Sequence, residues 1–292
     1  MIQPSIGFIG LGLMGGNMAS CLLEKGYKLN VWGRSDVSVA ATVNAGASRY
    51  DTPKALAEAS EIIMLCVTTS DVVEGLIYGT DGILAGIKPG ATVIDYGTSI
   101  PASTQKIGAD LATKGAGMID APLGRTPAHA KNGMLNIMAS GDRSTFEKVK
   151  PVLDIQGENV FYLGALGAGH TAKLINNFMG MTTVCAMSQA FAIADQAGID
   201  GQKLFDIMSA GPSNSPFMEF CKKYAVDGES NLGFSIANAN KDLAYFVQMV
   251  QDLGTSAPIA HATSRNLQSA MDAGLGDRNV PEIFDYFRSL KN

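Results

Sequence analysis

The sequence predicts an α/β protein whose N-terminal part is a Rossmann-type, doubly wound and mostly parallel sheet, followed by an all-helical C-terminal domain. Two patterns predict this: short apolar runs alternate with helical stripes over the first half of the chain, and only helical patterns follow residue 164. The composition agrees, because 46% of the 292 residues are hydrophobic and only 17% are charged, as in a chain that buries a substantial core.

The first elements are expected to be a strand and a helix. Residues 6–9 form an apolar run typical of a buried strand. Met14, Met18 and Leu22 then recur every four residues, which indicates a helix that ends near Gly26. Similar apolar runs predict the later strands at 29–32, 62–67, 92–95 and 118–120.

Sequence signals for helix N-termini occur between and after these strands. Pro101 suits the first position of a helix, where its missing N–H is no loss. Ser144 and Glu147 have the spacing of a capping box and predict a helix start at Ser144. Because strands that alternate with helices are joined by right-handed crossovers, the sheet is expected to be mostly parallel.

The second half of the chain has the pattern of successive helices. Between residues 168 and 197 there is no proline and one interior glycine, Gly180, so a single long helix is expected. Shorter helices are expected at 202–209, 236–253, 258–273 and 281–290.

A cluster of glycines, Gly164, Gly167 and Gly169, separates the two halves. We therefore expect a Rossmann-type α/β domain at 1–163 and a helical domain at 164–292.

Charge and cysteine usage exclude several function classes. The net charge is −5 and the 22 Lys and Arg residues are scattered, so neither nucleic acid nor a membrane surface is an expected partner. The longest apolar stretch is far shorter than the roughly 18 residues that a membrane span needs, and we expect a cytoplasmic protein. The cysteines are expected to be core thiols and the histidines surface imidazoles, with no metal site, because no ligand-like spacing occurs among Cys21, Cys66, Cys185, Cys221, His129, His170 and His261.

A glycine-rich segment directly follows the first strand and precedes the first helix. Its pattern is G-x-G-x-x-G, which in this context is typical of a dinucleotide-binding loop. Gly10 permits the tight turn, Gly12 lets backbone amides approach a pyrophosphate, and Gly15 allows close packing of the helix on the strand. The residues expected to bind the cofactor here are Gly10, Leu11, Gly12, Leu13, Met14 and Gly15.

The end of the second strand indicates which dinucleotide is bound. An acidic residue there would hydrogen-bond the ribose diol of NAD, but this chain has Gly33, Arg34 and Ser35. A guanidinium and a hydroxyl suit a 2′-phosphate, so NADP is the expected cofactor. The nearby Asp36 keeps NAD open as an alternative.

Four segments in order resemble the β-hydroxyacid dehydrogenase family, which includes 3-hydroxyisobutyrate dehydrogenases and tartronate semialdehyde reductases. The resemblance covers essentially the whole chain. It rests on the glycine loop at 7–15, the segment DAPLGRT at 120–126, the glycine run at 164–169 leading to KLINN at 173–177, and KDL at 241–243.

The resemblance implies a catalytic role for Lys173. Hydride delivery to an aldehyde or ketone leaves negative charge on oxygen, and a positioned ammonium can stabilise that charge and donate the proton. Asn177 lies four residues later on the same helix face, where its amide can hold the substrate or orient the lysine. Asn176, on an adjacent face, is a further expected substrate contact.

Other residues are expected near the cofactor. Val67 and Thr68 follow a strand at the carboxyl edge of the sheet, where such folds bind ligands. By resemblance, Thr98 corresponds to a family residue near the nicotinamide ribose, and Lys241 to a lysine of the helical domain that closes over the cofactor.

The substrate loop departs from the common family pattern. Most members have Ser-Gly-Gly where this chain has Gly124, Arg125 and Thr126, a variant that resembles the sulfolactaldehyde reductase branch. By this resemblance Arg125 grips a sulfonate, because a guanidinium binds oxyanions in fork geometry. Gly33 and Arg34 depart from that branch, in which an acidic residue ends the second strand.

The sequence thus predicts an NADP(H)-dependent reductase of a small anionic aldehyde, with 3-sulfolactaldehyde favoured, acting as a homodimer or homotetramer. Succinate semialdehyde, with γ-hydroxybutyrate as its alcohol, stays open as a substrate because arginine binds carboxylate as readily as sulfonate. Enzymes of the 3-hydroxyisobutyrate or tartronate semialdehyde type also stay open. The alternative from another class is a non-catalytic NADP-binding protein, in which we would expect the lysine at 173 to be lost.

Overall fold

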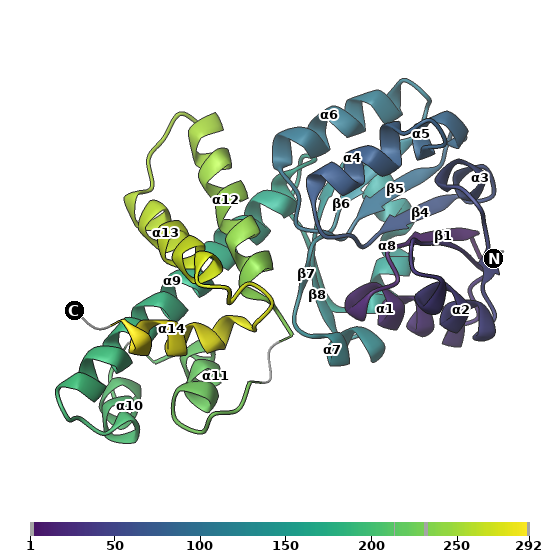
Figure 1. The fold of residues 1–292 in the computed structure, drawn as a ribbon. Helices are drawn as coiled ribbons and strands as arrows, with labels where there is room; N and C mark the ends of the chain where they lie inside the picture. The colour runs from purple at the N-terminus through teal and green to yellow at the C-terminus, as the bar shows by residue number, and fades with distance from the viewer. Residues whose placement is uncertain (1–2, 213, 231–232, 291–292) are drawn as a thin grey trace. The chain divides into compact units, whose positions relative to one another are not determined.

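The computed structural model describes residues 3–212, 214–230 and 233–290. It divides into two compact units, Met1–Lys173 and Leu174–Asn292. The first contains all of the strands in the described part of the chain, and the second is built from helices (Figure 1). This confirms the predicted fold class.

Six parallel strands form the main part of the sheet in the first unit. Their spatial order is β3-β2-β1-β4-β5-β6, the strand order of a classical dinucleotide-binding fold. They are β1 (Ile6–Ile9), β2 (Leu29–Trp32), β3 (Ser48–Arg49), β4 (Ile62–Leu65), β5 (Thr92–Asp95) and β6 (Gly117–Asp120). The predicted strands are confirmed, although β4 is two residues shorter than the apolar run that predicts it, and the two-residue strand β3 was not predicted.

Three further strands extend the sheet beyond β6 and were missing from the sequence prediction. They are β7 (Leu123–Gly124), β8 (Leu135–Gly141) and β9 (Gly157–Tyr162). β8 runs antiparallel to both β6 and β7, whereas β9 pairs with it in parallel. The chain after β6 thus adds three more strands at this edge of the sheet.

Helices cover both faces of the sheet (Figure 1). One apolar core lies between the sheet and α1, α2, α7 and α8, and includes Phe8, Met18 and Phe146. The other lies between the sheet and α3 to α6, and includes Ile63 and Ile107. The helices of this unit are α1 (Leu13–Glu24), α2 (Asp36–Asn44), α3 (Pro53–Glu58), α4 (Ser70–Tyr78), α5 (Ile83–Gly86), α6 (Pro101–Ala112), α7 (Pro127–Lys131) and α8 (Arg143–Gln156).

One predicted helix start is correct and another is wrong. Pro101 is the first residue of α6, as predicted. The capping box predicted at Ser144 does not form, because the N-cap of α8 is Asp142, two residues earlier. The Asp142 carboxylate accepts hydrogen bonds from the Thr145 N–H at 2.9 Å and from the Ser144 hydroxyl at 2.5 Å. An aspartate beside the predicted cap therefore takes its place.

The second unit packs its helices around two aromatic-rich clusters. Phe191 and Phe284 meet edge to face in one cluster, with a centroid distance of 5.6 Å, and Phe178 stacks on Phe246 at 4.6 Å in the other. The helices are α9 (Ala168–Gln196), which begins in the first unit, α10 (Gly201–Ser209), α11 (Pro216–Ala225), α12 (Ile236–Asp252), α13 (Pro258–Asp272), the 3-10 turn η1 (Val280–Glu282) and α14 (Ile283–Ser289). The long helix and the four shorter ones are confirmed, whereas α11 was not predicted.

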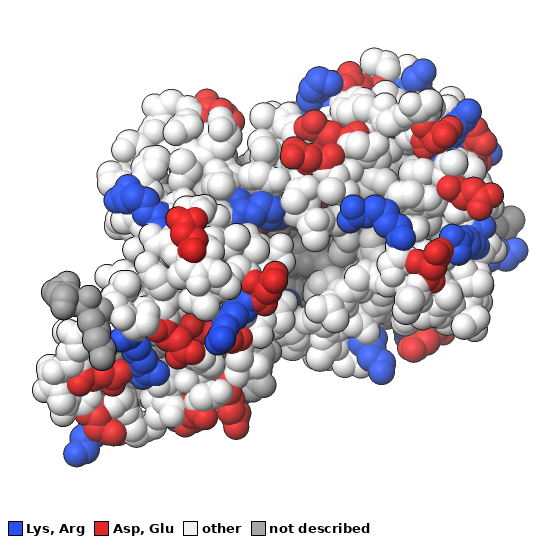
Figure 2. Space-filling view, viewed as in Figure 1, with Lys and Arg blue, Asp and Glu red and all other residues white. Residues whose placement is uncertain are grey.

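Lys, Arg, Asp and Glu side chains are interspersed on the face drawn in Figure 2, with no broad area of one sign. Within the described ranges, no helix has both the length and the apolar character needed to cross a membrane.

Candidate active site

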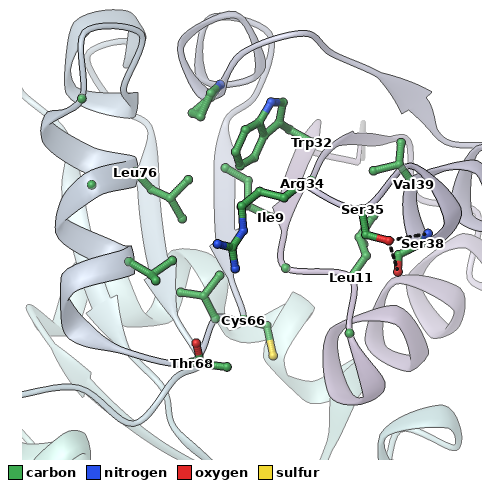
Figure 3. Close-up of a pocket in the computed structure, with 18 of the residues that line it drawn as sticks. Ile9, Leu11, Trp32, Arg34, Ser35, Ser38, Val39, Cys66, Thr68 and Leu76 are labelled. Atoms are coloured by element: carbon green, nitrogen blue, oxygen red, sulfur yellow. Dashed lines mark hydrogen bonds between the residues drawn. The ribbon is translucent and has the colours of Figure 1, made fainter.

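A pocket of about 780 Å³ opens at the carboxyl edge of the sheet in the first unit (Figure 3). Its walls come from the loop after β1, the end of β2, the segment after β4 and one face of α4. Parallel sheets bind ligands at this edge, beside the point where the strand order reverses. Of the residues predicted to bind a cofactor, the pocket wall contains Gly10, Leu11, Gly12, Gly33, Arg34, Ser35, Val67 and Thr68.

The three glycines of the loop differ in their surroundings. Gly10 has a φ of 99°, and a Cβ on it would lie 2.2 Å from the Cys66 carbonyl oxygen. A Cβ on Gly15 would lie 1.9 Å from the Gly10 carbonyl oxygen. Gly12 has no atom within 4 Å of its Cβ position, so its lack of a side chain leaves open space on the pocket wall.

The first turn of α1 has the features of a helix terminus that can bind an anion. Its N-cap is Gly12, with no side-chain cap and no acidic residue in the turn. The N–H groups of such a turn and the helix dipole favour a phosphate. The open space beside Gly12 and this helix terminus together fit the pyrophosphate of a dinucleotide.

A second polar group lies where β2 ends. Figure 3 shows the Arg34 side chain extending into the pocket, with Ser35 and Ser38 on the neighbouring wall. Ser35 is the N-cap of α2, accepting a hydrogen bond from the Ser38 N–H at 3.4 Å. The carboxylate of Asp36, the residue that left NAD open, forms an ion pair of 2.7 Å with Arg49.

Not every predicted cofactor residue lines this pocket. Leu13, Met14 and Gly15 belong to the first turn of α1, and Thr98 follows β5 outside the pocket wall. Lys241 belongs to α12 in the second unit. Sequence reasoning missed several wall residues. Val72 and Leu76 lie on α4, and no sequence signal showed which face of that helix would turn towards the sheet edge. The others come from segments that lie apart in the chain and meet only in the fold; they are Trp32, Ser38, Pro53 and Asp81.

The predicted substrate loop has an unusual backbone. Arg125 has a φ of 79° and is the one non-glycine residue with positive φ among those the structure describes. Its guanidinium donates to the Met134 carbonyl at 2.7 Å and pairs with the Glu158 carboxylate. The neighbouring Thr126 hydroxyl lies 2.8 Å from His129 Nδ1. The arginine expected to bind an anion thus already has a carboxylate partner.

The glycine run before α9 brings the helix close to the end of the sheet. Gly164 and Gly167 have φ values of 93° and 94°, which favour glycine. A Cβ on Gly169 would lie 2.2 Å from the Met138 carbonyl oxygen. Lys173 follows one turn into α9 and is half-buried.

His170, expected as a surface imidazole, is instead fully buried. It lies in the first turn of α9, and Thr104 and two aspartates surround its ring. The prediction was wrong because a histidine after a glycine run gives no sign in sequence that the helix start will be pressed against the sheet. Cys21, Cys185 and Cys221 are buried as predicted, whereas Cys66, a residue of the pocket wall, is of intermediate exposure as a whole although its thiol is desolvated.

Asn177, in the second unit, is part of a polar chain between α9 and α12. It is buried, and its amide donates to Asp242 Oδ2 at 2.6 Å. The other oxygen of Asp242 lies 2.9 Å from Lys241 Nζ, which in turn lies 5.2 Å from the Tyr245 ring centroid. The predicted Asn176 is exposed. Asp242 lies within a segment that sequence reasoning named, but its link to Asn177 was not predicted.

Cys66 is the thiol nearest the predicted cofactor position. Burial, reinforced by the negative charge of Asp95, raises its pKa from 9.0 to about 12. A thiol with so high a pKa is not an effective nucleophile near neutral pH. The pocket therefore offers backbone amides, hydroxyls and a guanidinium, which suit ligand binding, and no activated thiol.

Two family models match the chain in succession. The one described as the NAD binding domain of 6-phosphogluconate dehydrogenase matches residues 5–164. The one described as the NAD-binding domain of NADP-dependent 3-hydroxyisobutyrate dehydrogenase matches residues 167–287. The first match coincides with the strands and helices that form the pocket.

Individual relatives match over nearly their whole length. The 2-(hydroxymethyl)glutarate dehydrogenase of Eubacterium barkeri is 28% identical, over 98% of this chain and 95% of its own. The 3-sulfolactaldehyde reductase of Escherichia coli K12 is 30% identical, over 98% and 96%. The structure of Mycobacterium tuberculosis 3-hydroxyisobutyrate dehydrogenase with L-serine has a TM-score of 0.90 at 24% identity, over 99% of this chain and 100% of that chain. The names of these relatives agree in reaction type and differ in substrate.

Proposed function

The chain belongs to the β-hydroxyacid dehydrogenase family of NAD(P)-dependent oxidoreductases, and from this premise we propose that it is an NADP(H)-dependent reductase of a small anionic aldehyde. The favoured substrate is 3-sulfolactaldehyde. The observation that carries the substrate class is Arg125, a guanidinium in the loop where the family pattern has Ser-Gly-Gly.

The preference for NADP is supported by the end of β2. A 2′-phosphate carries negative charge, which the Arg34 guanidinium and the N-terminal turn of α2 both stabilise. The hydroxyls of Ser35 and Ser38 add hydrogen-bond donors. The carboxylate of Asp36 would repel a 2′-phosphate, but its ion pair with Arg49 reduces this repulsion.

When bound, the reduced nicotinamide supplies the hydride. Delivery of the hydride to the aldehyde carbon breaks the carbonyl π bond and leaves the electron pair on oxygen. In this proposal the Lys173 ammonium stabilises that oxygen and donates the proton that completes the alcohol. Asn177 holds the substrate or orients the lysine, and Lys241 and Thr98 contribute to cofactor binding.

Substrate binding is assigned to Gly124, Arg125 and Thr126, with Asn176 as a further contact. In this assignment the anion of the substrate replaces Glu158 as the partner of the Arg125 guanidinium. The second candidate is a carboxylate-bearing aldehyde of the succinate semialdehyde or tartronate semialdehyde type. It is favoured by the relative named 2-(hydroxymethyl)glutarate dehydrogenase, whose substrate is a carboxylate.

The test is NADPH oxidation against sulfolactaldehyde, succinate semialdehyde, tartronate semialdehyde and glyoxylate, in the wild type and in Arg125→Ala. Loss of one charge-assisted hydrogen bond should raise KM for the best anionic substrate at least about tenfold. Glu158→Gln should lower that KM, because it removes the carboxylate that competes with the substrate. Arg143→Ala is the matched control, since Arg143 is also paired with a glutamate, Glu147, but on α8.

The panel separates the substrates. Highest kcat/KM with sulfolactaldehyde supports the sulfonate, and highest kcat/KM with a carboxylate substrate replaces it. An Arg125→Ala variant with unchanged KM for every anionic substrate excludes Arg125 as the anchor.

A further inference from the structure

Three ionisable side chains are fully buried together in the first unit, and the proposed reaction uses none of them. They are Asp95 at the end of β5, Asp120 at the end of β6 and His170 in the first turn of α9. His170 Nε2 lies 3.7 Å from Asp95 Oδ2, and its Nδ1 lies 3.8 Å from Asp120 Oδ2. Burying an ionisable group costs free energy unless hydrogen bonds or an opposite charge compensate it, so these three side chains depend on their partners.

The two aspartates repel each other unless something lies between them. Asp95 and Asp120 are register partners on adjacent parallel strands, so their side chains leave the same face of the sheet. Like charges placed directly opposite destabilise a sheet. The imidazole of His170 stands between the two carboxylates and is the polar group that both of them face.

Asp120 fixes the start of α9. Its Oδ1 accepts the Gly167 N–H at 2.9 Å, and its Oδ2 accepts the His170 N–H at 2.7 Å. Ser140, whose hydroxyl also donates to Asp120, accepts the Gly169 N–H at 2.9 Å. A carboxylate on backbone N–H groups forms strong, charge-assisted hydrogen bonds. Asp120 and the Ser140 hydroxyl together hold three backbone N–H groups at the start of the helix, those of Gly167, Gly169 and His170, to the end of the sheet.

Asp95 fixes the loop after β5 in the same way. Its Oδ1 accepts the Gly97 N–H at 2.8 Å, and its Oδ2 accepts the Ser99 hydroxyl at 2.7 Å. Thr98, proposed to contact the cofactor, lies between these two residues. The loop conformation therefore depends on the same carboxylate that faces His170.

The ring of His170 lies between the start of α9 and the loop after β5. Its Nδ1 lies 2.8 Å from the Thr104 hydroxyl on α6, while its Nε2 has no hydrogen-bond partner and faces Asp95. A hydrogen on Nε2 points at a carboxylate and is attracted, whereas a lone pair there would be repelled. Asp95 also acts on the Cys66 thiol, since its negative charge adds to the effect of burial in raising the pKa of that thiol.

We propose that Asp95, Asp120 and His170 are positioning residues that hold the first turn of α9 and the loop after β5 in one arrangement, and thereby set the position of the Lys173 ammonium. Lys173 lies three residues after His170, so a rotation or shift of the first turn moves its side chain directly. The inference rests on the proposed role of Lys173. It adds a reason why a histidine, and not an apolar residue, occupies this buried position.

The test compares two substitutions at one position. His170→Gln keeps an N–H near the place of Nε2, and His170→Leu fills the space without one. We expect kcat to stay within about threefold in His170→Gln and to fall at least about tenfold in His170→Leu. The basic limb of the pH–rate profile should shift in His170→Leu, because it reports the proton donor.

A buried residue further along the same helix provides the control. Ser188→Ala removes a buried hydroxyl that donates to the Val184 carbonyl at 2.7 Å, and should leave the pH–rate profile unchanged. If His170→Leu does not fold, Thr104→Val serves instead, since it removes the group that orients Nδ1. It should lower kcat several-fold and shift the basic limb of the pH–rate profile.

The outcomes separate this inference from the proposed function. Full turnover by Lys173→Ala overturns the proposed function itself. An inactive Lys173→Ala, together with folded His170→Leu or Thr104→Val variants that keep wild-type kcat and pH profile, leaves the proposed function standing and overturns the positioning role. Equal loss of kcat in His170→Gln and His170→Leu also overturns it.

Discussion

Gly12 illustrates how a single residue indicates a ligand. Gly10 and Gly15 are required by the protein's own packing, since any Cβ on them would collide with a backbone oxygen. No such contact surrounds Gly12. The open space at Gly12 is what the proposed binding of a pyrophosphate beside the first turn of α1 requires.

Arg34 allows a sharp prediction about cofactor preference. Arg34→Ala should lower kcat/KM for NADPH about tenfold or more, because one charge-assisted contact to the 2′-phosphate is lost, and should leave kcat/KM for NADH within about twofold. Initial rates with both cofactors at a saturating aldehyde concentration measure this. NADH, which lacks the 2′-phosphate, is the internal control.

Equal losses with the two cofactors would show that Arg34 supports the pocket wall and not the phosphate. A wild-type enzyme that prefers NADH would reject the NADP assignment, with Asp36 as the residue to examine next.

Residues that act through distant partners were the hardest to predict from sequence. The glycine loop has a local pattern with a known geometric requirement, so its conformation could be predicted. The buried positions of Asp95 and His170 depend on segments that lie far apart in the chain and meet only at the sheet edge. Likewise, Glu158 is 33 residues from Arg125, and no local pattern connects them.

At the scale of elements, the position of α9 depends on how closely its start approaches β8. Gly169→Ala would place a Cβ 2.2 Å from the Met138 carbonyl oxygen, which is backbone and cannot swing away. We expect the free energy of unfolding to fall by more than about 2 kcal/mol, as for other overpacked sites, and kcat to fall because Lys173 moves with the turn. Urea unfolding and steady-state rates measure the two effects.

Gly180→Ala, within the same helix, is the matched control. Its Cβ would lie 3.6 Å from Phe217 Cζ, an ordinary contact. The higher helix propensity of alanine should stabilise the protein by up to about 1 kcal/mol. A Gly169→Ala variant as stable and active as Gly180→Ala would mean that α9 tolerates displacement from the sheet.

Elements differ in how well the sequence predicts them. The fully buried parallel strands are apolar runs, and α9 has a long uninterrupted helical pattern, so both could be predicted to within one or two residues. β8 and β9 were missed because they are less continuously apolar, and their existence depends on pairing with each other and with β6. The short helix α11 was missed although Ser215 and Pro216 form a cap and first-turn signal.

At the scale of the whole molecule, the core contains buried titratable thiols as well as apolar side chains. Cys66 and Cys185 lie in different units, and burial raises the pKa of each from 9.0 to about 12. Burial raises the pKa of Cys221 equally. Because these thiols lie in both units, their ionisation makes the free energy of unfolding of each unit depend on pH.

These thiols predict how stability depends on alkaline pH. A thiol with a raised pKa in the folded protein releases its proton more readily when the chain unfolds, so stability is fully present below pH 9 and is lost as pH rises towards 12. Each thiol contributes a slope approaching about 1.4 kcal/mol per pH unit once pH exceeds its unfolded pKa.

Urea unfolding at pH 9, 9.5 and 10 would measure the total slope of the free energy of unfolding against pH. The Cys185→Ala, Cys221→Ala double variant should have a shallower slope than the wild type, because two thiols with raised pKa values are removed, whereas Cys66, Cys21 and the tyrosines with raised pKa values remain. A slope equal to that of the wild type would mean that these thiols are as accessible to water in the folded protein as in the unfolded chain.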